Sequence, residues 1–77
     1  MQILSQNKCL IINNYTGIYY ELVSEYHCIL CSVSRVSDDA NEMLLGKYNS
    51  KERCKEIIKD ISIAINRGTK CFEMPQG

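Results

Sequence analysis

The stretch "NSKERCKEIIKDISIAINRG" (49–68) carries the clearest structural signal in the chain, because its apolar residues recur with a helical period. Asn49 or Ser50 can cap the first turn, and Gly68 can end the helix in a left-handed conformation. The spacing places six apolar residues on one face of the helix: Cys54, Ile57, Ile58, Ile61, Ala64 and Ile65. The pattern predicts an amphipathic helix over about 50–67 whose apolar face is buried.

The chain before this helix has the composition of β-strands. Four segments are rich in β-branched and aromatic residues and are separated by polar turn residues: 8–13, 18–26, 27–36 and 42–48. We expect a tight hairpin turn near 24–27 and a loop at 37–41. Gly46, inside the last of these segments, suggests a bulge or a close approach of the backbone.

Residues 69–77 predict a short final strand or an extended segment docked on the sheet. The sequence therefore predicts an α+β fold, with a small antiparallel sheet of three to five strands packed on one C-terminal helix (about 50–67) and then a short extended tail. A chain of 77 residues is long enough for one hydrophobic core but not for two, so we expect residues 1–77 to form a single domain.

A C-x-x-C motif, "CILC" (28–31), suggests a metal site, a redox pair or a strand that contains two cysteines. Zinc usually takes four ligands from two paired sets, and the other cysteines here are isolated. A thioredoxin-like pair needs its first cysteine at a helix N-terminus, and the surrounding residues favour a strand. Side chains three apart on a strand point to opposite faces. We therefore expect Cys28 and Cys31 to serve as apolar strand residues, with no metal or cofactor bound.

The composition argues against several broad classes of protein. Nine basic and nine acidic side chains cancel, whereas proteins that bind nucleic acid in bulk usually carry a basic excess. The longest apolar runs are about four residues, far short of the roughly 20 that span a bilayer, and no targeting segment is visible. The five cysteines are an odd number, which argues against a disulfide scaffold. We therefore expect a cytoplasmic protein with no membrane segment.

No catalytic group is predicted. His27 is the only histidine, and it stands beside Cys28 on an expected strand, where adjacent side chains point apart. Asp38 and Asp39 are typical of a solvated turn. The sequence thus lacks a recognisable nucleophile–base pair, and we expect the chain not to be an enzyme.

Tyrosines and cations are the candidate binding residues, because five of the six aromatic residues are tyrosines. An exposed tyrosine beside Arg or Lys can stack a base and pair a phosphate. The same residues make good anchors in a protein interface, and they can also simply pack within the sheet. The candidate ligand-binding set is Tyr19, Arg35, Lys47, Tyr48 and Arg53.

Three segments carry a family resemblance: "MQILSQN" (1–7), "LLGKYNSKERCKEIIKDI" (44–61) and "FEMP" (72–75). They resemble short proteins of phages and prophages of Gram-positive bacteria, whose pattern is M-x-I-L-S-Q-D/N, then a strand ending L-G-x-Y, then a helix opening S/T-x-E-R/K-A, then a short F-x-M/F-P segment. Cys54 stands where that pattern has Ala. The resemblance covers about half of the chain, and residues 15–40 match nothing specific.

The resemblance implies a phage context without a catalytic signature. Small phage proteins of this kind usually act by binding, and many block a host defence system. The leading hypothesis is an anti-defence protein that sequesters a nucleotide-derived immune signal in the host cytoplasm. The alternative is a small inhibitor that binds a host defence protein directly. Small size, zero net charge and the surplus of tyrosines also predict a homo-oligomer.

Overall fold

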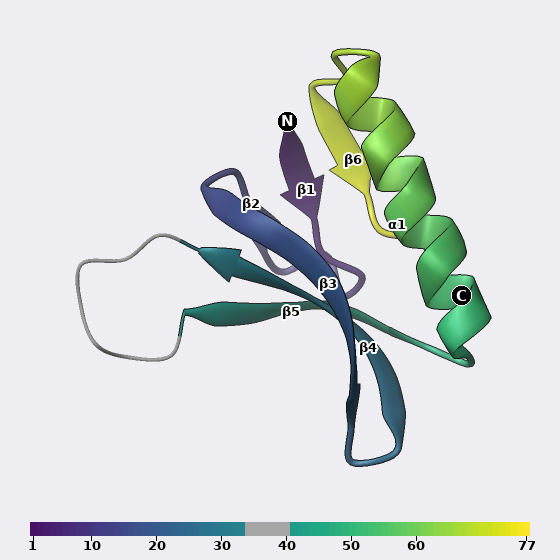
Figure 1. Cartoon of the computed structure of the whole chain (residues 1–77). Coiled ribbons are helices and arrows are strands. Elements are labelled where there is room, and N and C mark those ends of the chain that lie inside the picture. The colour runs from purple at the N-terminus through teal and green to yellow at the C-terminus, as the bar shows by residue number, and fades with distance from the viewer. Residues whose placement is uncertain (34–40) are drawn as a thin grey trace.

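The computed structural model describes residues 1–33 and 41–77. Within them lie six strands and one helix, shown in Figure 1: β1 (Gln2–Leu4), β2 (Ile11–Ile12), β3 (Tyr15–Val23), β4 (Tyr26–Val33), β5 (Glu42–Tyr48), α1 (Lys51–Asn66) and β6 (Cys71–Glu73). The predicted α+β class is confirmed. The strands, however, form two small sheets instead of one, with orders β2-β1-β6 and β3-β4-β5.

The larger sheet is an antiparallel meander in which β4 lies between β3 and β5. The β3–β4 hairpin turns through Ser24 and Glu25, which both have positive φ, at 48° and 71°. A two-residue loop with positive φ at both positions has the twist of a type I′ turn, which matches the twist of paired strands. The predicted turn is confirmed. β3 starts at Tyr15, three residues earlier than predicted.

The smaller sheet joins an early segment of the chain to a late one. β1 pairs antiparallel with β2 and parallel with β6, and Ile3 lies opposite both Ile12 and Phe72. Ile3 is fully buried, and Met74, just after β6, is 1% exposed. β1 was not predicted from the sequence, and only Ile11–Ile12 of the strand predicted over 8–13 is a strand. Strands this short hold too little alternation to be predicted locally, and long-range pairing and burial define them.

The side chain of Gln6 joins the two sheets. Its amide nitrogen donates to the Lys47 carbonyl at 3.0 Å, and its amide oxygen accepts from the Lys47 N–H at 2.8 Å. The backbone N–H of Gln6 also donates to the Leu45 carbonyl at 2.8 Å. Gln6 therefore supplies the hydrogen bonds that a neighbouring strand would supply, and it covers this edge of β5.

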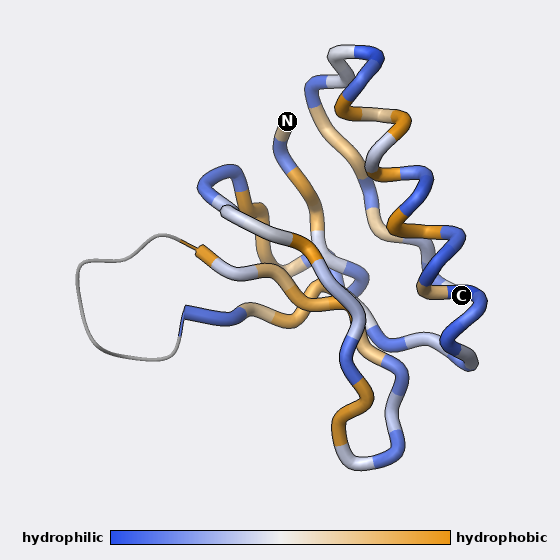
Figure 2. The backbone as a smooth tube through the Cα atoms, viewed as in Figure 1, coloured by the Kyte–Doolittle hydropathy of each residue, from blue (hydrophilic) through white to orange (hydrophobic). Residues whose placement is uncertain are grey.

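Helix α1 begins at a serine cap. Ser50 Oγ accepts a hydrogen bond from the Arg53 N–H at 3.1 Å, so Ser50, and not Asn49, caps the helix. After Asn66 the chain leaves the helix, and Gly68 takes the expected left-handed conformation, with φ of 72°. Figure 2 shows the hydrophobic sections of α1 turned mainly toward the strands. Four of the six predicted apolar residues are buried: Cys54, Ile57, Ile61 and Ala64.

Two residues of the predicted apolar face are not in the core. Ile58 is only half-buried, and Ile65 is 48% exposed. The prediction that Ile65 is buried is therefore wrong. The apolar face of α1 is wider than the part of it that the strands cover. The uncovered part, which includes Ile58 and Ile65, lies beside β3.

Gly46 allows a tight packing contact in β5. The register of β4 and β5 shifts between Ile29 and Leu30, which face Gly46 and Leu44 and leave Leu45 as the extra residue of a bulge. A Cβ atom on Gly46 would lie only 2.7 Å from Tyr48 Oη. Both expectations for Gly46, a bulge and a close approach, are therefore confirmed.

Candidate functional site

The two cysteines of the C-x-x-C motif point to opposite faces of β4, as predicted. Cys31 pairs with Ile18 and packs in the core, whereas Cys28 pairs with Glu21 on the other face. Cys28 is nevertheless buried by its neighbours on that face, at 3% exposed, which the sequence did not indicate. Burial raises the pKa of the Cys31 thiol and also that of Cys54. Both core thiols are therefore protonated and poor nucleophiles at neutral pH.

His27 is paired with a tyrosine instead of a cysteine. Tyr20 Oη lies 2.8 Å from His27 Nδ1, and the two rings are stacked with centroids 5.9 Å apart. The ring of Tyr20 also lies under the Lys51 ammonium, 5.5 Å from its centroid. Within residues 1–33 and 41–77, no three His, Cys, Asp or Glu side chains are grouped so that they could hold a metal ion.

The structure does not gather the predicted ligand-binding residues into one site. Tyr19 and Lys47 lie on the same face of the larger sheet, since they pair with Leu30 and Cys28 of β4. Lys47 Nζ lies 4.6 Å from the centroid of the Tyr26 ring. Partial burial and the nearby Glu42 carboxylate raise the pKa of the Tyr19 hydroxyl.

The other three predicted residues are elsewhere. Tyr48 is 7% exposed in the core, its hydroxyl donates to the Pro75 carbonyl, and burial raises its pKa to about 12. It is a packing residue, because its ring cannot reach a surface ligand. Arg53, at the start of α1, donates from Nε to the Gly77 carbonyl at 3.0 Å. Arg35 lies outside the described residues.

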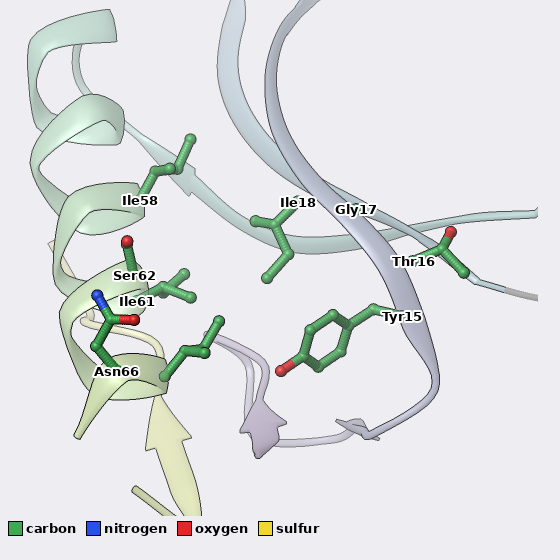
Figure 3. A pocket seen from close by; sticks show the side chains of 9 residues that line it. Tyr15, Thr16, Gly17, Ile18, Ile58, Ile61, Ser62 and Asn66 are labelled. Carbon is green, nitrogen blue, oxygen red and sulfur yellow. The ribbon is translucent and has the colours of Figure 1, made fainter. Parts of the chain in front are cut away.

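A groove between β3 and α1 is a concave and mainly apolar site among the described residues. It has a volume of about 350 Å³, within the range of ligand pockets. Figure 3 shows Tyr15 and Ile18 on β3 directed toward α1, and Ile58 and Ile61 on the facing side of the helix. Ser62, Ile65 and Asn66 complete the helical wall.

The backbone edge of β3 forms the other wall of this groove. Four consecutive residues, 15–18, line it, although alternate residues of a strand point to opposite faces. In Figure 3 the side chain of Thr16 points away from the helix, and its hydroxyl lies 2.9 Å from Ser32 Oγ. Thr16 therefore contributes its backbone to the groove. β3 is one of the two edge strands of its sheet, and its outer edge makes no backbone hydrogen bond to any described residue outside the sheet.

The walls of the groove are apolar, and the described residues that line it are uncharged. Isoleucines supply most of the walls, Ser62 and Asn66 supply polar side chains, and Thr16 supplies polar backbone groups. A second hollow shares Tyr15 and Ile65 with the groove and extends past the end of the helix, where Lys70 adds a positive charge. The Tyr15 hydroxyl donates to the Met1 carbonyl at 3.0 Å, which holds this ring in place.

Sequence reasoning missed this groove because it assigned Ile58 and Ile65 to the core. The signal was present in the width of the apolar face of the helix, which extends on one side beyond the four residues that become buried. Nothing in the sequence, however, shows that the strands leave that side uncovered.

Comparisons of the chain with protein-family models, with curated proteins and with solved structures find no match. The resemblance to phage and prophage proteins therefore stays a prediction. Over the described ranges, no helix combines the length and the apolar character that crossing a membrane requires.

Proposed function

We propose that this protein is a non-catalytic binding protein that holds an extended segment of another protein in the groove between β3 and α1. One observation carries the proposal: an apolar groove runs along a strand edge whose backbone groups are unpaired among the described residues. An added strand gains affinity from backbone hydrogen bonds, and pockets for alternate side chains give it specificity. The edge of β3 offers backbone groups for such hydrogen bonds, and the isoleucine groove offers the pockets for side chains.

The chemistry of the walls defines the segment that fits. Aliphatic side chains suit the space between Ile18, Ile58 and Ile65, because burying them gains about 25 cal/mol per Å² of apolar surface. Lys70, at the extended end of the groove, favours an acidic residue there. The proposed ligand is therefore an extended, aliphatic segment with an acidic residue placed near Lys70.

The proposed partner is a host defence protein, which was the alternative hypothesis from the sequence. The resemblance to phage and prophage proteins supports this partner class, and the groove supports binding of a protein over a nucleotide. Among the described residues, no charged side chain lines the groove itself, whereas proteins that recognise phosphate usually do so with Arg or Lys. Occupying a segment that the defence protein needs for its own assembly or activity would block it.

Sequestration of a nucleotide-derived signal is a second candidate, supported by one observation. Tyr26 and Lys47 form a cation–π pair on the larger sheet, and Tyr19 lies on the same face. An aromatic ring beside a cation can stack a base and pair a phosphate. This face also carries the carboxylates of Glu21 and Glu42, which repel phosphate, so the groove is the better-supported site.

The groove is tested with a library of short extended peptides and two matched variants of α1. Ile65 and Ile63 are both exposed isoleucines of the helix, at 48% and 39%, but only Ile65 lines the groove. We expect I65K to abolish binding of the selected peptides and I63K to leave it unchanged. Because both side chains are exposed, both variants should fold, which circular dichroism checks.

Two results would redirect the proposal. Peptides that bind wild type and I65K equally would place the binding site elsewhere. Calorimetry against cyclic oligonucleotides and ADP-ribose derivatives tests the second candidate, since useful sequestration needs roughly nanomolar affinity. Nucleotide binding of that strength, lost in K47A and retained in I65K, would establish the second candidate in place of the first.

A further inference from the structure

The face of the larger sheet that points away from α1, here called the outer face, is uncovered in the described chain. The core cluster contains residues of the opposite face, such as Ile29 and Cys31, and the helix packs on that side. Three large apolar side chains of the outer face are exposed: Val23 at 41%, Tyr26 at 56% and Leu44 at 43%. A contiguous apolar surface of this kind marks an interaction site.

The registers of the sheet arrange the outer face in rows. One row is apolar and runs from Tyr19 on β3 through Leu30 on β4 to Leu44 on β5. The next row runs from Glu21 through Cys28 to Lys47, with an acid at one end and a base at the other. Among the described residues, no ion pair joins Glu21 to Lys47, because Cys28 and its strand lie between them.

From this arrangement we infer that the outer face binds a second copy of the chain. The two sheets pack face to face around a twofold axis that runs parallel to β4. Such an axis keeps the rows in register and places β3 of one copy over β5 of the other. Tyr19 then meets Leu44, Leu30 meets Leu30, and Glu21 meets Lys47 of the second copy. The outer face is therefore complementary to itself: apolar side chains meet apolar side chains, and each acidic side chain meets a basic one.

The other in-plane axis, perpendicular to the strands, gives a poorer match. It inverts the rows and lays each strand over its own copy. An axis between the apolar and the charged rows places Leu44 near Lys47 of the second copy, whereas an axis through the apolar row brings Lys47 to Glu42, two rows away on its own strand, and leaves Glu21 without a cation. Sheets that pack face to face keep their strands within about 30° of one another, which both axes allow, so the side chains decide between them.

The dimer is expected to be weak but specific. Three strands and about four rows cover roughly 15 by 25 Å, which is at the low end for a protein interface. Both β3–α1 grooves lie on the opposite side of the sheet and stay open, so a dimer presents two of them. The inference stands on the outer face alone and does not depend on what the grooves bind.

Sedimentation velocity from about 1 μM to about 1 mM, with a charge swap, tests the inference. We expect wild type to dimerise and K47E or E21K alone to weaken the dimer more than about tenfold, since each variant creates two like-charge contacts per dimer. The double variant K47E/E21K should restore the wild-type dissociation constant. The matched control K47E/E42K should not restore it, because Glu42 faces a different row.

Each outcome decides the question. A wild-type protein that stays monomeric up to the highest concentration would overturn the inference and leave the outer face for a different partner. Rescue by E42K instead of E21K would overturn the proposed axis. A dimer that neither charge reversal weakens would place the interface elsewhere. All substituted side chains are exposed, and thermal melts confirm that the variants are folded.

Discussion

Replacing Gly46 by alanine is the sharpest test of how the core is built. A Cβ atom at this position would lie 2.7 Å from Tyr48 Oη, 2.8 Å from Cε2 and 3.0 Å from Cζ. Ordinary contacts between such atoms are about 3.5–4.0 Å, so three atoms of one ring would be too close. The ring cannot easily retreat, because Tyr48 is 7% exposed and its hydroxyl donates to the Pro75 carbonyl at 2.9 Å.

The expected cost follows from these contacts. Displacing a packed ring costs about 1–3 kcal/mol, and breaking the hydrogen bond to Pro75 adds about 1 kcal/mol. Alanine recovers about 0.5–1 kcal/mol, because glycine is the more flexible residue in the unfolded chain. We therefore expect G46A to lower the free energy of unfolding by about 1–3.5 kcal/mol, or the midpoint of thermal unfolding by about 5–25 °C.

Gly17 provides a matched control. A Cβ atom there would lie 3.3 Å from Ser32 Oγ, the end of a side chain that can rotate, so G17A should stay within about 1 kcal/mol of wild type. Urea unfolding, followed by circular dichroism, measures both variants. In a Y48L background the added cost of G46A should fall below about 1 kcal/mol. The reasoning is refuted if G46A is no more destabilising than G17A.

Four further predictions concern the stability of the fold. Stability should fall by about 2–3 kcal/mol between pH 10 and 12, because the unfolded chain loses the Tyr48 proton near pH 10 while the folded chain keeps it to a pKa of about 12; urea melts should show a smaller loss for Y48F. S50A should cost about 1 kcal/mol and N49A almost nothing, since only the serine caps α1; thermal melts that gave the reverse order would reassign the cap. E25G should stabilise the protein by up to about 1 kcal/mol, because Glu25 has a φ of 71° in the hairpin turn, and a lower melting temperature would contradict this. I61A should cost about 2–5 kcal/mol in chemical denaturation, as expected for a side chain that is 2% exposed.

The sequence predicted the elements whose signals are local. The helix could be placed to within a residue or two, because its apolar period, its cap and Gly68 all lie within one short segment. The strand over 42–48 and the hairpin turn near 24–27 were also correct. The opposite orientation of Cys28 and Cys31 followed from strand geometry alone.

The candidate site could not be predicted in the same way. Tyr48 was chosen as a ligand-binding residue because Lys and Arg residues lie near it in the sequence, yet it is 7% exposed and its hydroxyl donates to the Pro75 carbonyl. Ile65 was assigned to the core because of its helical spacing, yet it lines the open groove between β3 and α1 and is 48% exposed. In both cases a partner distant in sequence decides the exposure of the side chain, and no local pattern contains that information.

Local patterns in the sequence are enough to predict the α+β class, the position and polarity of the helix, and the two faces of each long strand. The pairing of β1 with β6, the edge of β3 that is unpaired among the described residues, and the groove beside it arise only when distant segments pack together. The two groups differ because short-range order depends on the period and conformational preference of neighbouring residues. The pairing of strands and the burial of their side chains, by contrast, depend on which distant segments together bury the most apolar surface.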